Sequence, residues 1–265
     1  MTGQPLPPLV TLTTDFGTQD PYVAAVKGVL HRECPGVRIE DLSHEVGPQN
    51  LIECALFVAG AAPWFPGGTI HLVVVDPGVG SSRTPIAVQA GGHHFVCPDN
   101  GLLSLYLAGY PEAEARTIAN PAFMLPEVSA TFHGRDIFAA CAARLAAGVS
   151  FEEVGPVAEQ LVSLALPRPR AEEDGRIQGV VIHVDHFGNC ITNIRRDDLR
   201  ENAPYRVQFG GRALPGIYAH YAAARPNQPL ALFGSTGYLE IAVREGDANQ
   251  GFGLDPGEPI TLYLP

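Results

Sequence analysis

Residues 69–78 read Thr-Ile-His-Leu-Val-Val-Val-Asp-Pro-Gly, and this stretch decides the fold class of the chain. Its run of apolar and β-branched side chains is nearly unbroken, which is typical of a strand covered on both faces. The run ends abruptly at Asp76-Pro77-Gly78, a combination that turns the chain. We therefore expect a buried strand over residues 69–75, followed at once by a loop.

The segments before this strand alternate between strand and helix patterns. Residues 9–13 are short and largely apolar and predict a first strand, and residues 37–42 predict a second. One helix is expected to begin at Pro21 with Asp20 as its cap, and a second amphipathic helix begins at Leu51. Strand, helix, strand, helix, strand in this order predicts a parallel sheet with helices on both faces and a ligand site beyond the carboxyl ends of the strands.

Beyond residue 78 the alternation of strand and helix patterns becomes less regular. Residues 86–89 and 94–97 predict a strand pair joined by two glycines, and residues 137–147 predict a helix. Residues 167–175 are rich in proline and then in charge, which favours a linker. We therefore expect an α/β nucleoside-binding domain over residues 1–170 and a second domain over residues 175–265.

The second domain consists of short alternating segments separated by Gly, Pro and Asn, a pattern typical of a small antiparallel barrel or sandwich. The segments are residues 177–184, 205–209, 230–233, 238–243 and 260–264.

Composition excludes several classes of protein. The 28 acidic residues against 17 basic ones give a net charge of −11, which disfavours nucleic acid as a partner. The longest apolar run, residues 51–65, contains Glu53 and Pro63 and is shorter than the roughly 20 residues that span a bilayer, so no membrane span is expected. Residues 1–8 do not have the pattern of a secretion signal. Five cysteines without metal-ligand spacing indicate reduced thiols in a cytoplasmic protein.

Asp15 follows the first predicted strand, where a carboxylate can accept hydrogen bonds from ribose hydroxyls. A carboxylate at this place is as often a helix cap or a loop residue. No GxGxxG pattern follows the strand, so binding of a dinucleotide phosphate is disfavoured while a nucleoside remains compatible.

Two loops carry candidate catalytic side chains. Asp76 and Arg83 bracket a loop rich in glycine and serine, which can form an anion nest, although a loop-closing salt bridge is the more frequent arrangement of such a pair. His133 lies in the loop of residues 131–136 and titrates near neutrality, as a general base or a water-orienting group must. A single loop histidine is more often a surface residue or a core hydrogen-bonding group.

Two predicted corners of the second domain carry polar side chains. Asp185 and Asn189 flank a Phe-Gly corner and together suit an amino-acid zwitterion, although an Asx turn explains them equally well. Ser235 lies in a second corner, residues 234–240, whose backbone and hydroxyls can hold a carboxylate.

The sequences and the order of these motifs closely resemble those of the S-adenosylmethionine hydroxide adenosyltransferases. These enzymes are relatives of the fluorinase and chlorinase that attack the same substrate with halide. The resemblance covers residues 9–264. The motifs that carry it are residues 12–17, residues 75–80 with Arg83, residues 98–101, residues 131–136, and residues 187–189 with Thr192 and Asn193.

The resemblance implies a Rossmann-like amino-terminal domain, a smaller carboxy-terminal antiparallel β-barrel and a homotrimer whose active sites lie between the large domain of one subunit and the small domain of the next. It assigns the attacking water to Asp76, Arg83 and His133. It assigns the substrate to Asp15 at the ribose, to Asn100 in the motif of residues 98–101, and to Asp185, Asn189 and Ser235 at the methionine end. The halogenases have a Ser-Arg pair where this chain has Ser235 and Thr236.

The reaction that the resemblance implies is hydrolysis of S-adenosyl-L-methionine to adenosine and L-methionine by in-line attack of water or hydroxide on C5′, with no metal or other cofactor. Arg83 cannot be the base, and His133 is slightly favoured over Asp76 as proton acceptor because its ordinary pKa is nearer neutrality. The alternatives are a halide-dependent adenosyltransferase, a non-catalytic module that binds adenosine or S-adenosylmethionine, and a methyltransferase. The halogenases carry an extra loop and lack the Asp-Arg-His set, which favours water over halide.

Overall fold

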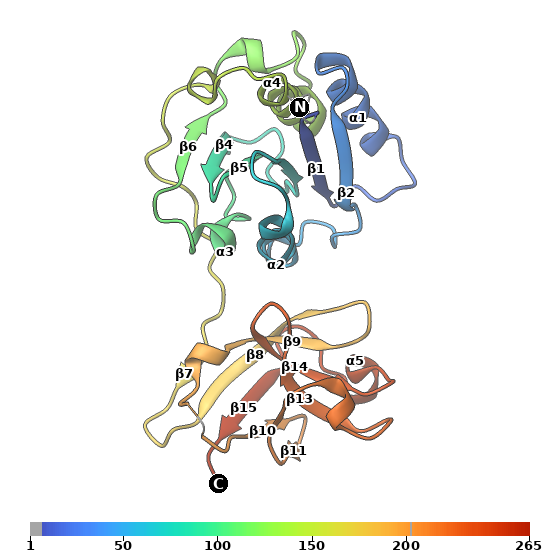
Figure 1. Ribbon diagram of the computed structural model, residues 1–265, viewed down its shortest axis with the longest axis vertical. Coiled ribbons are helices and arrows are strands. Elements are labelled where there is room, and N and C mark those ends of the chain that lie inside the picture. The colour runs from blue at the N-terminus through green and yellow to red at the C-terminus, as the bar shows by residue number, and fades with distance from the viewer. Residues whose placement is uncertain (1–6, 202) are drawn as a thin grey trace, which may run out of the picture. The chain divides into compact units, whose positions relative to one another are not determined.

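A computed structural model describes residues 7–201 and 203–265, and the chain divides into two compact units, Met1–Leu164 and Ala165–Pro265. The N-terminal unit contains a six-stranded sheet in the order β2-β1-β3-β5-β4-β6 (Figure 1). Its strands are β1 Leu9–Thr14, β2 Arg38–Ser43, β3 Ile70–Val74, β4 Pro85–Ala90, β5 His93–Pro98 and β6 Glu114–Thr117.

The first four strands of this order are parallel, and β4 runs antiparallel to both β5 and β6. The predicted α/β class and the predicted β4–β5 strand pair are confirmed, whereas β6 was not expected from the sequence. All five residues of β3 are buried, as its unbroken apolar run predicted.

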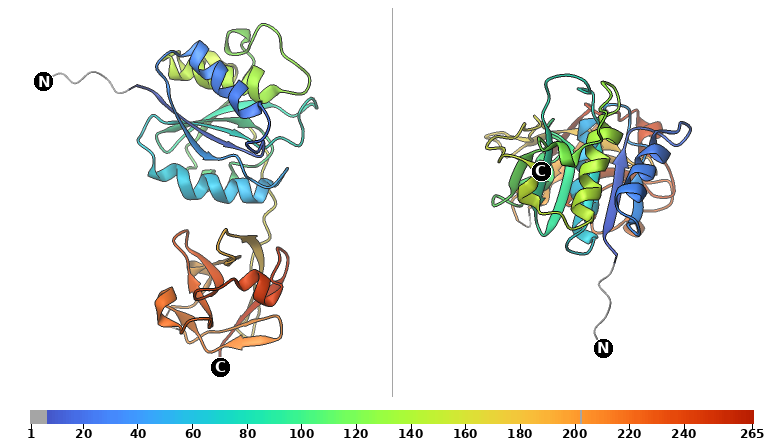
Figure 2. Two further views of the ribbon diagram at one scale, coloured as in Figure 1. Left: turned by 90° about the vertical axis from the view of Figure 1, so that its right-hand side faces the viewer. Right: turned by 90° about the horizontal axis from the view of Figure 1, so that it is seen from above.

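Helices cover both faces of the sheet (Figure 2). The helices are α1 Tyr22–Glu33, α2 Leu51–Ala61, α3 Ser104–Leu107 and α4 Ala140–Ala146, the last of which continues a π-helical turn over Gly134–Ala139. One core cluster joins α1 and α4 to one face through residues such as Val26, Leu72 and Phe138. A second cluster joins α2 and α3 to the other face through residues such as Val58 and Val73.

The expected cap of the first helix is wrong. The N-cap residue of α1 is Pro21, whose carbonyl accepts a hydrogen bond from Ala25 N at 2.9 Å, and no side chain caps the helix. Asp20 is exposed and lies outside the first turn. By contrast, Asn50 caps α2 because its side chain accepts a hydrogen bond from Glu53 N at 3.1 Å.

The C-terminal unit is a mostly antiparallel, nearly closed β-barrel, which confirms the predicted class. Its strands follow the order β11-β10-β15-β8-β9-β14-β13-β12, with β7 paired to β8 and a parallel pairing between β12 and β13. The five predicted strands are present, and β9 and three short strands were missed. The elements are β7 Arg170–Ala171, β8 Ile177–Val184, β9 Cys190–Arg195, β10 Arg206–Phe209, β11 Arg212–Leu214, β12 Ile217–Tyr218, β13 Pro229–Phe233, β14 Tyr238–Val243, α5 Ala248–Phe252 and β15 Pro259–Tyr263.

The cysteines are all buried and unpaired: Cys34, Cys54, Cys97, Cys141 and Cys190. Within residues 7–201 and 203–265, the structure has no helix with the length and apolar character that crossing a membrane requires.

Candidate active site

The order of strands in the N-terminal unit reverses between β1 and β3. The chain passes from β1 to its neighbour β2 and then crosses to β3 on the other side of β1. The register pairs Thr14 with Val74, so Asp15 and Asp76 extend from adjacent strands at the same edge of the sheet. Ligands of open α/β sheets bind at this kind of switch point, beyond the carboxyl ends of the strands.

Asp76, Arg83 and His133 are in direct contact at this edge. Arg83 Nε donates to both carboxylate oxygens of Asp76 at 3.0 Å, and Arg83 Nη2 donates to Asp76 Oδ2 at 2.5 Å. Arg83 Nη2 also lies 2.7 Å from Nδ1 of His133, a residue 50 positions away in the chain. The guanidinium therefore connects the loop after β3 to the loop before the π-helical turn.

The Asp76–Arg83 pair is shielded from solvent, because the side chain of Asp76 is 6% exposed and that of Arg83 is 9% exposed. The guanidinium carbon lies 5.0 Å from the centre of the Phe138 ring, which adds a cation–π contact. Hydrogen bonds in such a low-dielectric environment hold the fork of Arg83 in one orientation.

The contact with Arg83 determines the protonation of His133. A guanidinium can only donate, so Nδ1 of His133 accepts and the hydrogen of the neutral ring lies on Nε2. Burial and the charge of Arg83 lower the pKa of His133 below its ordinary 6.5, against the opposing charges of Asp76 and Asp136. The imidazole is therefore neutral at pH 7, with Nε2–H available as a donor.

Asp15 is anchored by the loop between β2 and α2. Its Oδ2 accepts a hydrogen bond from Gln49 N at 2.9 Å. Gln49 has φ of 62°, an uncommon value for a residue that is not glycine, and such strain often accompanies functional sites. Within residues 7–201 and 203–265, Asp15 Oδ1 accepts no hydrogen bond, so it can accept one from a ligand.

Asn100 forms a hydrogen bond to the backbone at the end of β3. Its amide donates to the carbonyl of Val75 at 2.9 Å, and its own oxygen accepts a hydrogen bond from Leu102 N at 3.3 Å. The residue before Asp76 is thus tied to the loop that follows β5.

In the C-terminal unit, Asp185 and Asn189 form one hydrogen-bonded turn. Asp185 Oδ1 accepts from Phe187 N and Asn189 N, both at 2.9 Å, and Oδ2 accepts from Asn189 Nδ2 at 2.8 Å. Ser235 is exposed in the turn between β13 and β14, which the hydrogen bond from Gly237 N to Gly234 O closes. The turn geometry is therefore present at both corners.

Sequence reasoning missed Glu240 in β14, which lies close to both corners. Its side chain is 6% exposed, accepts a hydrogen bond from the Tyr221 hydroxyl and lies against Gly234, where an added Cβ would come within 2.7 Å of Oε2. Burial raises the pKa of Glu240, and the charge of Asp185 adds to this effect. Glu240 alternates along β14 with the core residues Leu239 and Ile241, so the strand pattern predicts a side chain on the opposite face and its burial could not be read from the sequence.

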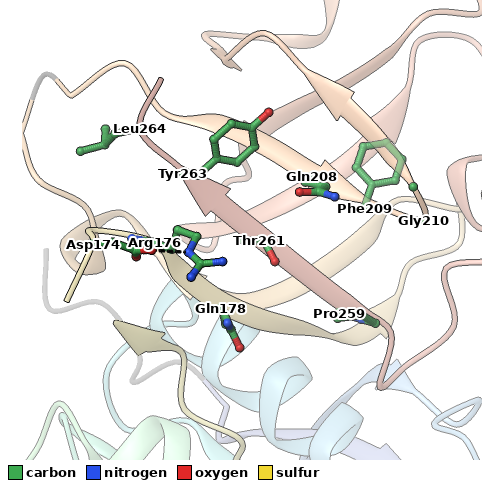
Figure 3. Close-up of a pocket in the computed structure, with 11 residues that line it drawn as sticks. Asp174, Arg176, Gln178, Gln208, Phe209, Gly210, Pro259, Thr261, Tyr263 and Leu264 are labelled. Carbon is green, nitrogen blue, oxygen red and sulfur yellow. Dashed lines mark hydrogen bonds and ion pairs between the residues drawn. The ribbon is translucent and has the colours of Figure 1, made fainter. Parts of the chain in front are cut away.

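A cavity of about 610 Å³ in the C-terminal unit lies over β8, β10 and β15 (Figure 3). Gln208, Thr261 and Gln178 form a cross-strand row along it. None of the expected site residues lines this cavity, which is consequently separate from the groups described above.

The fold and the site define a class: an α/β unit with an Asp-Arg-His group at its switch point, joined to a small β-barrel. Two family models match the chain, the SAM hydroxide adenosyltransferase N-terminal domain over residues 10–155 and the corresponding C-terminal domain over residues 179–261. The chain belongs to the SAM hydroxide adenosyltransferase family, as the motifs in its sequence predicted.

Curated relatives match over nearly the whole chain. A protein of Thermus thermophilus named (R)-S-adenosyl-L-methionine hydrolase is 39% identical over 260 residues, which are 96% of this chain and 98% of the relative. A protein of an Actinoplanes species named fluorinase is 28% identical over 289 residues, covering 96% of this chain and 97% of the relative.

The fold also matches a solved structure. The crystal structure of an uncharacterized conserved protein from Thermotoga maritima superposes with a TM-score of 0.87 at 35% identity, covering 96% of this chain and 99% of that chain. The architecture of both units is therefore shared with this protein.

Proposed function

We propose that the protein hydrolyses S-adenosyl-L-methionine to adenosine and L-methionine. The observation that carries this proposal is the contact of Arg83 with both Asp76 and His133 beyond the carboxyl end of β3. Family membership and the name of the Thermus thermophilus relative support the same reaction. That name also carries the (R) descriptor, so we propose the R epimer at sulfur as the preferred substrate.

The positive charge on sulfur makes methionine a good leaving group, because it departs from the sulfonium as a neutral thioether. A water oxygen attacks C5′ in line with the C5′–S bond, and the electron pair of that bond goes to sulfur. One proton of the water is released, which balances the products as adenosine, methionine and H⁺. The role left to the protein is to hold the water about 3 to 3.5 Å behind C5′ and to stabilise its developing charge.

Each side chain of the Asp-Arg-His group has a distinct role in the proposal. Arg83 lowers the pKa of the attacking water through its fixed positive charge. His133 donates from Nε2 to orient the water, since its Nδ1 is occupied by Arg83. Asp76 then accepts the proton at Oδ1, which accepts only from Arg83 Nε, whereas Oδ2 accepts from both Nε and Nη2. This assignment reverses the slight preference for His133 that its ordinary pKa suggested.

The remaining residues bind the substrate in this proposal. Asp15 accepts from the ribose hydroxyls, and Asn100 supports the site through the Val75 carbonyl. Asp185, Asn189 and Ser235 bind the methionine end, and the protein acts as a homotrimer whose sites are completed by the C-terminal unit of a neighbouring subunit.

The product mixture tests the proposal. The protein is incubated with an epimeric mixture of S-adenosylmethionine in halide-free buffer and the products are identified by mass, with adenosine and methionine expected and the R epimer consumed first. Unchanged substrate would indicate a binding module, and S-adenosylhomocysteine would indicate a methyltransferase; either would refute hydrolysis.

Halide-dependent transfer is the second candidate, because a fluorinase is 28% identical over nearly the whole chain. Adding chloride or fluoride to the same assay separates the two reactions. Accumulation of a 5′-halo-nucleoside in place of adenosine would favour the halogenase.

A further inference from the structure

Asp136 lies three residues after His133, and its side chain is completely buried. Its carboxylate accepts hydrogen bonds from Arg135 Nε at 2.5 Å, from Arg135 Nη2 at 3.0 Å and from Ser129 N at 2.8 Å. A buried charge with this many partners is expensive to disturb, because removing one partner leaves the others without compensation.

The backbone of Asp136 forms two further hydrogen bonds to the segment of residues 125–133. Its carbonyl accepts a hydrogen bond from Leu125 N at 2.8 Å, and its N–H donates to Phe132 O at 3.1 Å. Asp136 is thus bonded to Leu125, Ser129 and Phe132, which together fix the irregular segment of residues 125–133. Asp136 itself belongs to the π-helical turn Gly134–Ala139, a rare conformation that is frequent at functional sites.

The segment of residues 125–133 contacts the loop after β3, which carries Asp76 and Arg83. Its Ala130 carbonyl lies against Gly80, where an added Cβ would come within 2.7 Å of the oxygen. Its last residue, His133, accepts the hydrogen bond from Arg83. The ring of Phe132 also packs against Phe16, next to Asp15, with 5.9 Å between ring centres.

The charge of Asp136 also acts on the site. Burial opposes its ionisation, but hydrogen bonds from Arg135 and Ser129 outweigh burial and keep the pKa of Asp136 below its usual value. The resulting carboxylate raises the pKa of His133, against burial and Arg83, which lower it. Neutralising Asp136 should therefore alter His133 even where the backbone stays in place.

We propose that Asp136 is a positioning residue that sets the contact between His133 and Arg83 through residues 125–133, without touching the substrate. The proposal rests on the proposed function of the Asp76–Arg83–His133 group. It adds that the buried carboxylate of Asp136 holds His133 in contact with Arg83.

The test is Asp136→Asn, with Glu33→Gln as the matched control. Glu33 pairs with Arg32 and Arg144 at the far end of α1, so the control breaks ion pairs of the same unit away from the site. We expect Asp136→Asn to lower kcat by about tenfold or more while the Kd of adenosine changes by less than about twofold. The control should change neither quantity.

A second readout does not depend on turnover. In protein labelled with ¹⁵N-histidine, the His133 signals, assigned with His133→Gln, should show an unprotonated Nδ1 in the wild type and a lower pKa in Asp136→Asn. Failure of the wild type to hydrolyse S-adenosylmethionine would refute the proposed function, while these signals would still decide the role of Asp136.

A folding defect in Asp136→Asn does not leave the question open. The double variant R135Q/D136N removes both charges of the ion pair and leaves no unpaired guanidinium beside the substituted position, so it should fold and show the same loss of kcat. A folded variant with wild-type kcat and unchanged His133 signals would overturn the proposal, as would an equal loss in Glu33→Gln.

Discussion

His133 is a residue whose chemistry is decided by one neighbour. Because Arg83 donates to Nδ1 at 2.7 Å, the neutral ring carries its hydrogen on Nε2 and can orient a water but cannot take a proton at Nδ1 without losing this contact. Protonation would place two donors against each other. The proposed mechanism therefore requires the neutral form of the histidine.

Substitutions of His133 should reveal this donor role. We expect His133→Ala to lower kcat by about 10²-fold, and His133→Gln to lose clearly less, because the glutamine amide can donate from a position close to Nε2. The Kd of adenosine, measured by calorimetry, should stay near the wild-type value in both variants. Equal losses in the two variants would argue against an orienting donor.

The pH dependence of kcat follows from the same contact. Burial and Arg83 hold the pKa of His133 below 6.5, so activity should be constant above that value and fall as pH drops through the lowered pKa. A pH profile of the wild type checks this, and the acid limb should be missing in His133→Gln. An acid limb centred above 6.5 would contradict the lowered pKa.

At the scale of elements, the loop after β3 depends on glycine at position 80. Gly80 has φ of 77° and faces the Ala130 carbonyl, whereas Gly92 in the β4–β5 turn has φ of 79° and open space around it. The two glycines thus share the backbone conformation and differ in the close approach.

Alanine substitutions at Gly80 and Gly92 distinguish the effect of the left-handed backbone conformation from the effect of the close approach to Ala130. Both variants should lose about 1 to 2 kcal/mol of stability from the left-handed conformation, as measured by urea unfolding. Gly80→Ala should in addition lower kcat about tenfold or more because the two loops are forced apart. Wild-type kcat in Gly80→Ala would contradict the close packing of these loops.

The buried histidines of the sheet predict sensitivity to acid. His71 Nδ1 lies 2.7 Å from Thr11 Oγ1, and burial, with the neighbouring His93, lowers the pKa of His71 to about 3. Between about pH 6.5 and pH 3 the unfolded chain binds a proton that the folded chain does not, so stability falls as pH falls through this window.

Replacement of His71 should remove part of this dependence. We expect the wild type to lose about 2 kcal/mol more than His71→Gln between about pH 7 and pH 5, in urea unfolding followed by circular dichroism. The exposed His31 on α1 offers the control, and His31→Gln should keep the wild-type slope. Identical slopes in all three proteins would refute a buried neutral His71.

The elements also show what the sequence could and could not predict. The apolar run of β3 and the turn at Asp76 were readable because periodicity and turn residues are local signals. The contact between Arg83 and His133 was not, because it joins residues 50 positions apart through the packing of the π-helical turn on the sheet. The left-handed conformation of Gln49, whose backbone N–H donates to Asp15, leaves no mark in composition.

At the scale of the whole molecule, the proposed trimer predicts complementation between inactive variants. Co-expression of Arg83→Ala with Asp185→Ala should restore about a quarter of the sites, because each restored site combines an intact N-terminal unit with the intact C-terminal unit of a neighbour. Activity per mole of protein and light scattering of the purified assembly measure this. Monomeric protein, or no recovered activity, would contradict shared sites.

The most direct measurement of the central claim is a reaction in H₂¹⁸O. If water attacks C5′, the heavy isotope appears in the 5′-hydroxyl of adenosine and methionine stays unlabelled, which mass spectrometry reads from the two products. Adenosine without the label, or a labelled amino acid released beside methylthioadenosine, would contradict attack of water at C5′.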